Sequence, residues 1–497
     1  MNYKSTRDSK VCVTSAKAIA QGISEDGGLF VPYSIPTLSK EDVESIANMN
    51  YVDAARFVLG KYLTDFTEEE LKHCAEGAYL GTFDDNKPAP LKEVEKGVYS
   101  LELWHGPTCA FKDLALQILP FLLTKASKKT SDGEVKVILV ATSGDTGKAA
   151  LEGFSDVEGT KIFTFYPENG VSNMQKLQMI TTKGENVGVC AIKGNFDDAQ
   201  TGVKKIFTND EMKKKLGDNK LAFSSANSIN WGRLAPQIVY YVYSYASLLK
   251  EGPIKYGDKV NFVVPTGNFG NILAAYYAKK MGIPVNKLIC ASNKNNILTD
   301  FLTTGEYNRN RPFFTTLSPS MDILISSNLE RLLFDLTDGD DRVKGWMKEL
   351  SDNGVYTIDE ETKTKLGEHF CAGCCDDIET KETIKKVFDK FGYLADPHTA
   401  VALNVYEKYV EKTGDNTVSV IASTANPYKF CRGVLEAVTG GDVTETDEFV
   451  IADTLSNATN TTVPAQIKEL KAADIRFTNS VEKEDMPNTV LKFLGIN

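Results

Sequence analysis

The stretch that decides the fold class is residues 260–277, Val-Asn-Phe-Val-Val-Pro-Thr-Gly-Asn-Phe-Gly-Asn-Ile-Leu-Ala-Ala-Tyr-Tyr. It opens with a short β-rich run, passes through a turn of small residues and ends in a helical pattern. Residues 135–147 and 418–427 have the same design of a strand followed by a small-residue turn, each leading into a helical pattern. This alternation predicts βαβ units, and therefore an α/β fold with a doubly wound parallel sheet.

The turn Thr266–Asn271 is a candidate phosphate site, because ligands of such sheets bind at the carboxyl ends of the strands. Its glycines allow positive φ angles and let backbone N–H groups approach an anion, and the helix after it adds a partial positive charge. It lacks the Gly-Lys-Ser/Thr ending of a P-loop and the three-glycine spacing of a dinucleotide fingerprint. A single phosphate monoester is the better fit, and a turn without a ligand is the alternative.

A second turn, Ser143–Gly147, follows the strand at 135–141. Its hydroxyls and backbone amides can receive a carboxylate, which suits an amino-acid substrate. Lys148 follows the turn, but no serine or threonine comes after it, so this is not a P-loop either. A turn without a ligand is again the alternative.

The segment His105-Gly-Pro-Thr-Cys-Ala-Phe-Lys-Asp113 contains the strongest candidate for a reactive side chain. Its Gly-Pro pair predicts a turn, and Asp113 can cap a helix that starts directly after it. Lys112 would then lie at a loop-to-helix junction beside Phe111. A lysine shielded by apolar neighbours has a lowered pKa and can form an imine. A solvated lysine at a helix start is the alternative that these neighbours leave open.

Composition and charge exclude several classes of partner. The chain has 497 residues, of which 25% are charged and 42% hydrophobic, and a net charge of −11. Such an acidic protein repels phosphate backbones and anionic lipid, so we expect no nucleic-acid and no membrane partner. The N-terminal residues lack the apolar core of a signal peptide, and no apolar run approaches the roughly 20 residues that span a bilayer. We expect a cytoplasmic enzyme with reduced cysteines.

The cysteines Cys371, Cys374 and Cys375 lie close to His369 in the sequence, which is one hint of a metal site. No second pair of ligands follows at the spacing typical of zinc sites. We therefore expect no metal in this protein.

A chain of this length predicts more than one core. We expect an N-terminal, mostly helical region over residues 1–93, because residues 36–80 combine capping signals with helical periodicity. The first α/β domain is expected at 94–245 and the second at 246–497. Residues 296–390 interrupt the pattern of strands and are rich in charge, so we interpret them as a largely helical insertion.

Several motifs together resemble those of threonine synthases, of the longer type found in enteric bacteria and fungi. They occur in the order of that family and extend over nearly the whole chain: Asp26–Pro32, His105–Asp113, Thr142–Gly147, Asn227–Arg233, Pro265–Gly270, Pro319–Ile323, Ser326–Leu333 and Ser423–Pro427. The segment from Pro319 to Leu333 resembles the longer type rather than the plant-like type.

The resemblance implies a fold type II enzyme that uses pyridoxal 5'-phosphate (PLP), with two doubly wound parallel-sheet domains around a cleft. Its implied reaction is the conversion of O-phospho-L-homoserine and water into L-threonine and phosphate, by γ-elimination and β-hydration. It also implies a monomer or a weak homo-oligomer, and no site for S-adenosylmethionine.

The resemblance also assigns roles to residues of this chain. Lys112 would form the Schiff base with PLP and carry protons. The residues implied to hold the cofactor phosphate are Gly267, Asn268, Phe269, Gly270 and Asn271, and Thr424 would meet the pyridine nitrogen. Near the substrate carboxylate and the ring we expect Ser143, Asp145 and Thr146. The implied receptors of the substrate phosphate are Asn227, Ser228, Asn230 and Arg233, with Lys176 as a further cation.

Two positions depart from the pattern of the family. Asn271 stands where relatives commonly have aspartate, and Asn426 where histidine is common. The second departure removes a possible proton donor, which puts the rate and the pH optimum in question rather than the reaction type. The alternatives are a phospho-lyase or dehydratase of the same fold, and a non-catalytic relative kept for binding.

Overall fold

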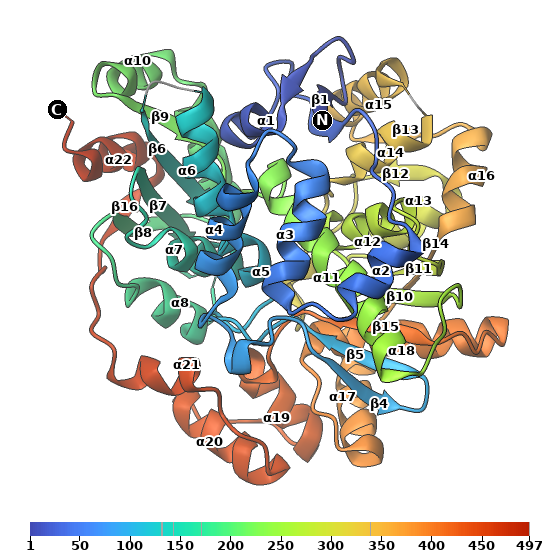
Figure 1. Cartoon of the computed structure of the whole chain (residues 1–497). Coiled ribbons are helices and arrows are strands. Elements are labelled where there is room, and N and C mark those ends of the chain that lie inside the picture. The colour runs from blue at the N-terminus through green and yellow to red at the C-terminus, as the bar shows by residue number, and fades with distance from the viewer. Residues whose placement is uncertain (131–132, 143, 170, 338, 497) are drawn as a thin grey trace.

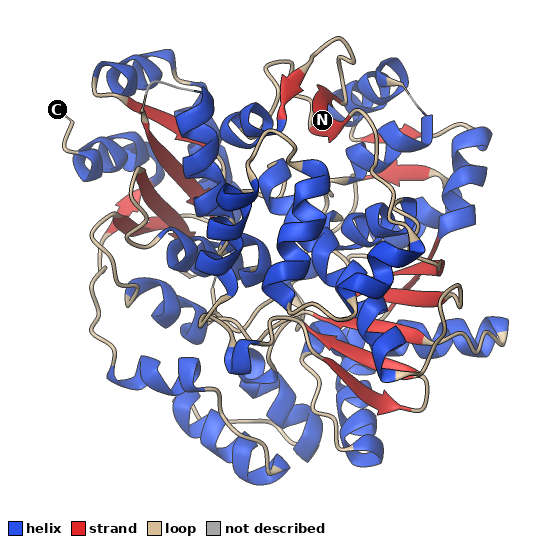
Figure 2. Ribbon diagram, in the orientation of Figure 1, coloured by secondary structure: helices blue, strands red, loops and turns tan. Residues whose placement is uncertain are grey.

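The computed structural model describes residues 1–130, 133–142, 144–169, 171–337 and 339–496. Figure 2 shows its strands gathered in two main groups with helices around them. The α/β class with parallel sheets, expected from the sequence, is confirmed.

The first of these groups is a five-stranded sheet in which every pair is parallel. Across the sheet, its strands are β16 (Ser480–Glu482), β8 (Val187–Lys193), β7 (Thr160–Pro167), β6 (Val135–Ala141) and β9 (Leu221–Ser224). Helices α7 (Asp145–Phe154) and α9 (Phe196–Thr208) pack on β6 and β7. The central strands are buried and rich in valine, isoleucine and phenylalanine, as expected for a sheet with covered faces.

The second group is a six-stranded sheet. Across it, the strands are β14 (Phe370–Cys374), β11 (Val285–Ser292), β10 (Val260–Pro265), β15 (Ser419–Ser423), β5 (Val98–Glu102) and β4 (Leu91–Glu95). All pairs are parallel except β4 with β5. Helices α12 (Gly270–Lys280) and α18 (Pro397–Thr413) pack against its central strands.

Each of the two sheets contains strands from distant parts of the sequence. β4 and β5 precede every strand of the first sheet in the chain, yet β5 pairs with β15 in the second sheet and β4 pairs with β5. Conversely β16, near the C-terminus, pairs with β8 (Figure 1). The expected boundaries at 93 and 245 stay a prediction, and the sheets themselves do not follow them.

The N-terminal region combines three short strands with helices. The strands β1 (Asn2–Ser5), β2 (Val13–Thr14) and β3 (Phe30–Pro32) form a small antiparallel sheet. The helices are α1 (Ser15–Gln21), α2 (Lys40–Ile46), α3 (Tyr51–Tyr62) and α4 (Glu68–Tyr79). α2 and α3 pack on the long helix α11 (Trp231–Glu251), which is buried along most of its length. α5 (Asp113–Leu116) and α6 (Leu119–Thr130) also contact α11.

The segment 296–390 is largely helical but is not wholly an insertion. Its helices are α13 (Ile297–Thr304), α14 (Leu329–Thr337), α15 (Asp340–Asn353), α16 (Glu360–His369) and α17 (Asp377–Phe391). β12 (Glu306–Asn308) and β13 (Val355–Thr357) form a separate antiparallel pair. β14, however, is an edge strand of the six-stranded sheet. β14 is short and contains a glycine, and charged helices flank it in the sequence. Its sequence therefore has little of the pattern typical of a buried strand.

Six further α-helices in the described part of the chain complete the fold. They are α8 (Asn173–Ile180), α10 (Asp210–Asp218), α19 (Cys431–Thr439), α20 (Glu448–Thr459), α21 (Ala465–Lys468) and α22 (Met486–Leu494). α19 and α20 pack together at the lower edge of Figure 1. None of the helices in the described ranges combines the length and apolar character that crossing a membrane requires.

Candidate active site

The predicted turns converge on one buried site between the two sheets. Lys112 stands at the start of α5, in the segment after β5, and the isolated bridge between Ala110 and Ala425 holds this segment beside the turn after β15. The backbone N–H of Phe111 donates to the carbonyl of Thr424 at 2.8 Å. The segments of Lys112 and Thr424 are therefore neighbours, although the two residues are 312 positions apart in the sequence.

Lys112 is only 9% exposed. Its Nζ donates a hydrogen bond to Ser320 Oγ at 3.2 Å and lies 4.8 Å from the centre of the Phe111 ring. Burial lowers the pKa of Lys112, Asp145 opposes that shift, and the positive charges of Lys429 and Arg233 add to it. The amine of Lys112 therefore loses its proton more readily than the amine of an exposed lysine.

Asp145, the first residue of α7, is the carboxylate at the centre of the site. Its Oδ1 lies 2.9 Å from Lys429 Nζ, and its Oδ2 lies 3.7 Å from Lys112 Nζ. Gln175, from α8, donates to Oδ1 at 3.2 Å. Burial alone would raise the pKa of Asp145, but the charges of Lys429 and Lys112 outweigh burial and hold it well below its usual value. Asp145 is therefore a permanent anion in this site.

The turn between β10 and α12 has the backbone form of an anion cradle. Phe269 adopts a left-handed conformation with φ 61° and stands at the N-cap of α12. Its ring is buried against Phe370. A Cβ on Gly267 would lie 2.6 Å from the carbonyl oxygen of Ser320, so only glycine allows this close approach. The expected location of this turn at the start of a helix is what the structure has.

Asn271, in the first turn of α12, forms hydrogen bonds through its side-chain oxygen but not through its side-chain nitrogen. Its Oδ1 accepts from the hydroxyls of Tyr240 and Tyr241, at 2.5 and 2.6 Å. Its Nδ2 is buried and has no hydrogen-bond partner among the described residues. Buried donors without partners are rare in folded proteins, so this one indicates a missing acceptor.

Arg233 lies in the first turn of α11 and is 3% exposed. One terminal nitrogen donates to the carbonyl of Ala226 at 2.6 Å, while its Nε is buried without a partner among the described residues. Burial lowers the pKa of Arg233 to about 10, which still leaves it a cation at neutral pH. A buried guanidinium without a carboxylate needs a bound anion.

Asn230 is placed differently from expectation. Its Nδ2 donates to the carbonyls of Ile19 and Ser225, and its Oδ1 caps α11 by accepting from the N–H of Gly232. Every polar atom of this side chain is therefore occupied. Asn230 positions the start of α11, and with it Arg233, rather than offering a donor of its own.

The other residues expected in the site make fewer hydrogen bonds than those described above. Ser228 Oγ lies 3.2 Å from Ser327 Oγ, and Asn227 is half-buried beside it. Thr146 follows Asp145 on α7, and Lys176 follows Gln175 on α8. The prediction for Ser143 falls outside the described residues.

Three contributors were missed by the sequence analysis: Lys429, Ser320 and His398. Lys429 Nζ also donates to the carbonyl of Thr108 at 2.8 Å and is wholly buried. The Nε2 of His398 accepts from the backbone N–H of Ser320 at 3.1 Å. Lys429 follows the recognised segment Ser423–Pro427 by two positions, which was the one available signal for it.

The buried charged side chains of the site indicate whether a phosphorylated cofactor fits here. Lys112, Lys429 and Arg233 are buried cations close enough for the latter two to lower the pKa of Lys112, and they face one permanent carboxylate, Asp145. Burial raises the pKa of Asp113 to about 6, in spite of hydrogen bonds from Thr108, so it is mostly ionised at neutral pH and offsets one of the three positive charges. An excess of buried positive charge and unpaired donors suits ligands that carry phosphate.

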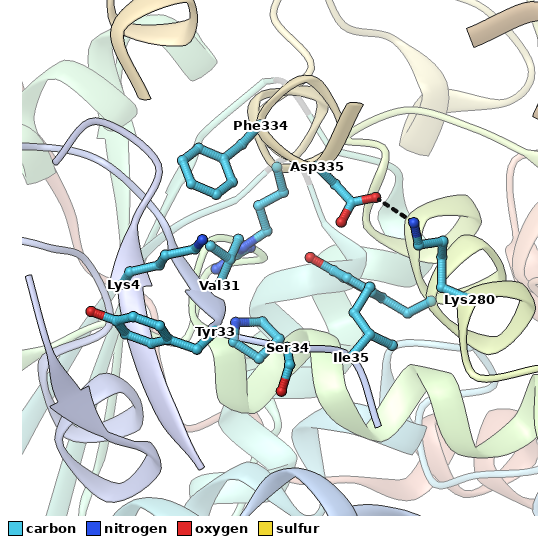
Figure 3. Close-up of a pocket in the computed structure, with 11 residues that line it drawn as sticks. Lys4, Val31, Tyr33, Ser34, Ile35, Lys280, Phe334 and Asp335 are labelled. Atoms are coloured by element: carbon cyan, nitrogen blue, oxygen red, sulfur yellow. Dashed lines mark ion pairs between the residues drawn. The ribbon is translucent and has the colours of Figure 1, made fainter. Parts of the chain in front are cut away.

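No group of three or more His, Cys, Asp or Glu side chains in the described ranges is placed to hold a metal ion. A cavity of about 240 Å³ lies elsewhere, between the N-terminal strands and α14 (Figure 3). Lys4, Tyr33 and Phe334 line it, and Lys280 pairs across it with Asp335 at 3.5 Å. None of the site residues named above belongs to its lining.

Three family models match this chain. Threonine synthase N terminus matches residues 2–79, pyridoxal-phosphate dependent enzyme matches residues 85–363, and threonine synthase, C-terminal, matches residues 399–488. With the buried lysine and the cradle at α12, these matches make the chain a PLP-dependent enzyme of fold type II.

Relatives narrow the class. Threonine synthase of Saccharomyces cerevisiae is 36% identical, and the match covers 97% of this chain and 98% of that protein. The solved structure of PLP-bound threonine synthase from Brucella melitensis is 36% identical with a TM-score of 0.88, over 99% of both chains. This chain belongs to the threonine synthase family. Human threonine synthase-like 1 is 40% identical over 87% of this chain, which spans 59% of the length of that relative.

Proposed function

We propose that this protein is a threonine synthase that converts O-phospho-L-homoserine and water into L-threonine and phosphate. The observation that carries the proposal is the excess of buried positive charge around Lys112. Such a site suits a cofactor and a substrate that each bring a phosphate group. The similarity to the threonine synthases of yeast and Brucella supports the same function.

At the cofactor end, Lys112 would form the covalent bond to PLP. The backbone of residues 267–271 would receive the cofactor phosphate at the N-terminus of α12, where the helix dipole favours an anion. The free Nδ2 of Asn271 is a further donor for this group. Thr424, whose carbonyl accepts from the backbone N–H of Phe111 next to Lys112, would meet the pyridine nitrogen.

At the substrate end, we propose that Arg233 grips the phosphate, with its unpaired Nε as one of the donors. Asn227 and Ser228 would add an amide and a hydroxyl, and Lys176 a second cation. Asn230 contributes by fixing the start of α11. The carboxylate of the substrate would lie near Ser143 and Thr146, at the N-terminus of α7.

When bound, the cofactor supplies an electron sink that makes the protons on Cα and Cβ of the substrate removable. We propose that Lys112 takes the proton from Cα and returns it after water has added at Cβ. An amine that both takes and gives a proton needs a pKa near the working pH, and burial moves that of Lys112 in this direction. Asp145 is held beside this amine by its ion pair with Lys429 at 2.9 Å.

The deciding test is an assay of the purified full chain with PLP and O-phospho-L-homoserine. We expect equal amounts of L-threonine and phosphate, each dependent on Lys112. Formation of 2-oxobutyrate with ammonia would instead indicate a phospho-lyase or dehydratase. Absence of turnover together with retained PLP binding would indicate a non-catalytic relative.

We further propose a cytoplasmic location and a monomer or weak homo-oligomer. The acidic composition of the chain supports the first point. Microscopy of a tagged protein in its own cell and light scattering of the purified chain would test the two points separately.

A further inference from the structure

A chain of buried polar contacts leads from α18 to the nitrogen of Lys112. Asp396, the N-cap of α18, lies with Oδ1 2.7 Å from Nδ1 of His398. Nε2 of His398 accepts from the backbone N–H of Ser320 at 3.1 Å. The hydroxyl of Ser320 in turn lies 3.2 Å from Lys112 Nζ.

The partners of His398 fix the tautomer of its ring. Nε2 faces a backbone N–H, which can only donate, so this nitrogen has to be unprotonated. Nδ1 therefore bears the hydrogen and donates it to Asp396. The carboxylate of Asp396 also accepts from the N–H groups of His398 and Thr399, at 2.9 and 3.2 Å. Both His398 and Asp396 are almost fully buried, so ring orientation is set by the fold.

Ser320 has a different role at each of its two polar groups. Its N–H is held by His398, within the short 3-10 turn η2 (Pro319–Met321). Its hydroxyl accepts from Lys112 Nζ and donates to Asp145 Oδ2, also at 3.2 Å. The direct distance between Lys112 and Asp145 is 3.7 Å, too long for a hydrogen bond. Ser320 is thus the bridge between the amine and the carboxylate.

We propose that Ser320 is a catalytic residue that holds the Lys112 amine and connects it to Asp145, and that His398 and Asp396 are positioning residues that hold Ser320. This inference deepens the proposed function, because it concerns the same proton-carrying lysine. It also explains why η2 lies against Gly267, since that contact brings the hydroxyl beside the cofactor cradle.

The first experiment compares Ser320→Ala with Ser320→Thr in the full chain. The readout besides turnover is the pH dependence of labelling of Lys112 by an amine-acylating reagent, measured by mass spectrometry after removal of PLP. Ser320→Ala removes an acceptor of the ammonium form, so we expect the labelling midpoint to fall by ~1 pH unit. We expect kcat to fall by about 10- to 100-fold with KM changed by less than about 3-fold. Ser320→Thr keeps the hydroxyl and should preserve both values.

The second experiment compares His398→Phe with His398→Gln. Phenylalanine cannot accept from the Ser320 N–H, whereas the glutamine carbonyl oxygen can. We expect His398→Phe to shift the labelling midpoint in the same direction as Ser320→Ala. His398→Gln should leave the midpoint close to that of the wild type. Ser326→Ala is the matched control, because its hydroxyl donates to the carbonyl of Gly267 in the same region without touching Lys112.

Identical midpoints for Ser320→Ala and Ser320→Thr, or an equal shift in Ser326→Ala, would overturn the inference. Urea unfolding of each variant separates a local effect from loss of the fold. The labelling midpoint requires no substrate, so it tests Ser320 even if the wild-type chain makes no threonine. Conversely, threonine formation with unchanged midpoints would reject only the role of Ser320.

Discussion

Lys429 and Asp145 form an ion pair of 2.9 Å in which the lysine side chain is 0% and the aspartate side chain 4% exposed. The two residues come from the turn after β15 in one sheet and from the helix after β6 in the other. The pair therefore connects the two halves of the site as well as balancing its charge.

Replacing Lys429 should destabilise the protein strongly. Lys429→Met leaves Asp145 buried with Lys112 as its only nearby lysine, and breaking one side of a buried pair costs ~3–5 kcal/mol. Lys429→Met combined with Asp145→Asn should recover part of that loss, because no unpaired carboxylate remains. Urea unfolding measures both, with the exposed Lys96→Met as a control that stays within about 0.5 kcal/mol of wild type. A small effect of Lys429→Met alone would contradict the importance of the pair.

Asp113 should make stability depend on pH in an unusual direction. Burial raises its pKa from 3.8 to about 6, so folding favours the protonated form. The stability that it contributes is fully present below pH 4 and is lost as the pH rises through 6, a change of ~3 kcal/mol. We expect Asp113→Asn to gain stability relative to wild type by this amount between pH 4 and 7. Parallel unfolding curves at both pH values would refute the assignment.

Arg233 should determine substrate affinity rather than cofactor affinity. With Arg233→Met, we expect KM for O-phospho-L-homoserine to rise about 10- to 100-fold, because a charge-assisted phosphate contact is lost. PLP affinity, followed by absorbance during titration, should change by less than about 3-fold. Arg309→Met, at an exposed guanidinium that bonds to the Ser351 carbonyl, is the control. An equal loss of affinity for the substrate and for PLP would show that Arg233 does not act on the substrate phosphate alone.

The two glycines of the cradle should respond differently to a methyl group. A Cβ on Gly267 meets the backbone oxygen of Ser320 at 2.6 Å, whereas the nearest atom to a Cβ on Gly270 is 3.5 Å away. We expect Gly267→Ala to lose ~1–3 kcal/mol of stability through this overlap, and Gly270→Ala to stay within about 1 kcal/mol. Thermal unfolding of the two variants without PLP compares them directly, and a reversed order would show that the 319–321 turn gives way easily.

The fold was predictable wherever a local pattern specifies it. The segments that begin near residues 135, 260 and 418 each combine strand and turn signals with a helical pattern directly after them. In the structure β6 is followed by α7, β10 by α12, and β15 by η3 (Pro427–Phe430) and α19. β14 was missed because an edge strand of five residues, flanked by charged helices, has no such local signature.

The site was only partly predictable, for a related reason. Lys112 belongs to a motif, but the contacts of Ser320 with Lys112 and His398 join segments far apart in the sequence. Asn230 shows the opposite error: its residue type suits a phosphate donor, yet its position at the N-cap of α11 uses all of its polar atoms. Residue type alone does not reveal which partner a side chain has already taken.

The pairing of β16 with β8 has a consequence for how the protein is made. The other strands of that sheet end at residue 224, while β16 begins at residue 480. At about 5–20 residues per second, a ribosome needs on the order of tens of seconds to supply the missing strand. During that interval the apolar edge of β8 in the nascent chain is open to pairing with other chains. Truncation before residue 480 should therefore yield aggregation rather than a shorter active enzyme.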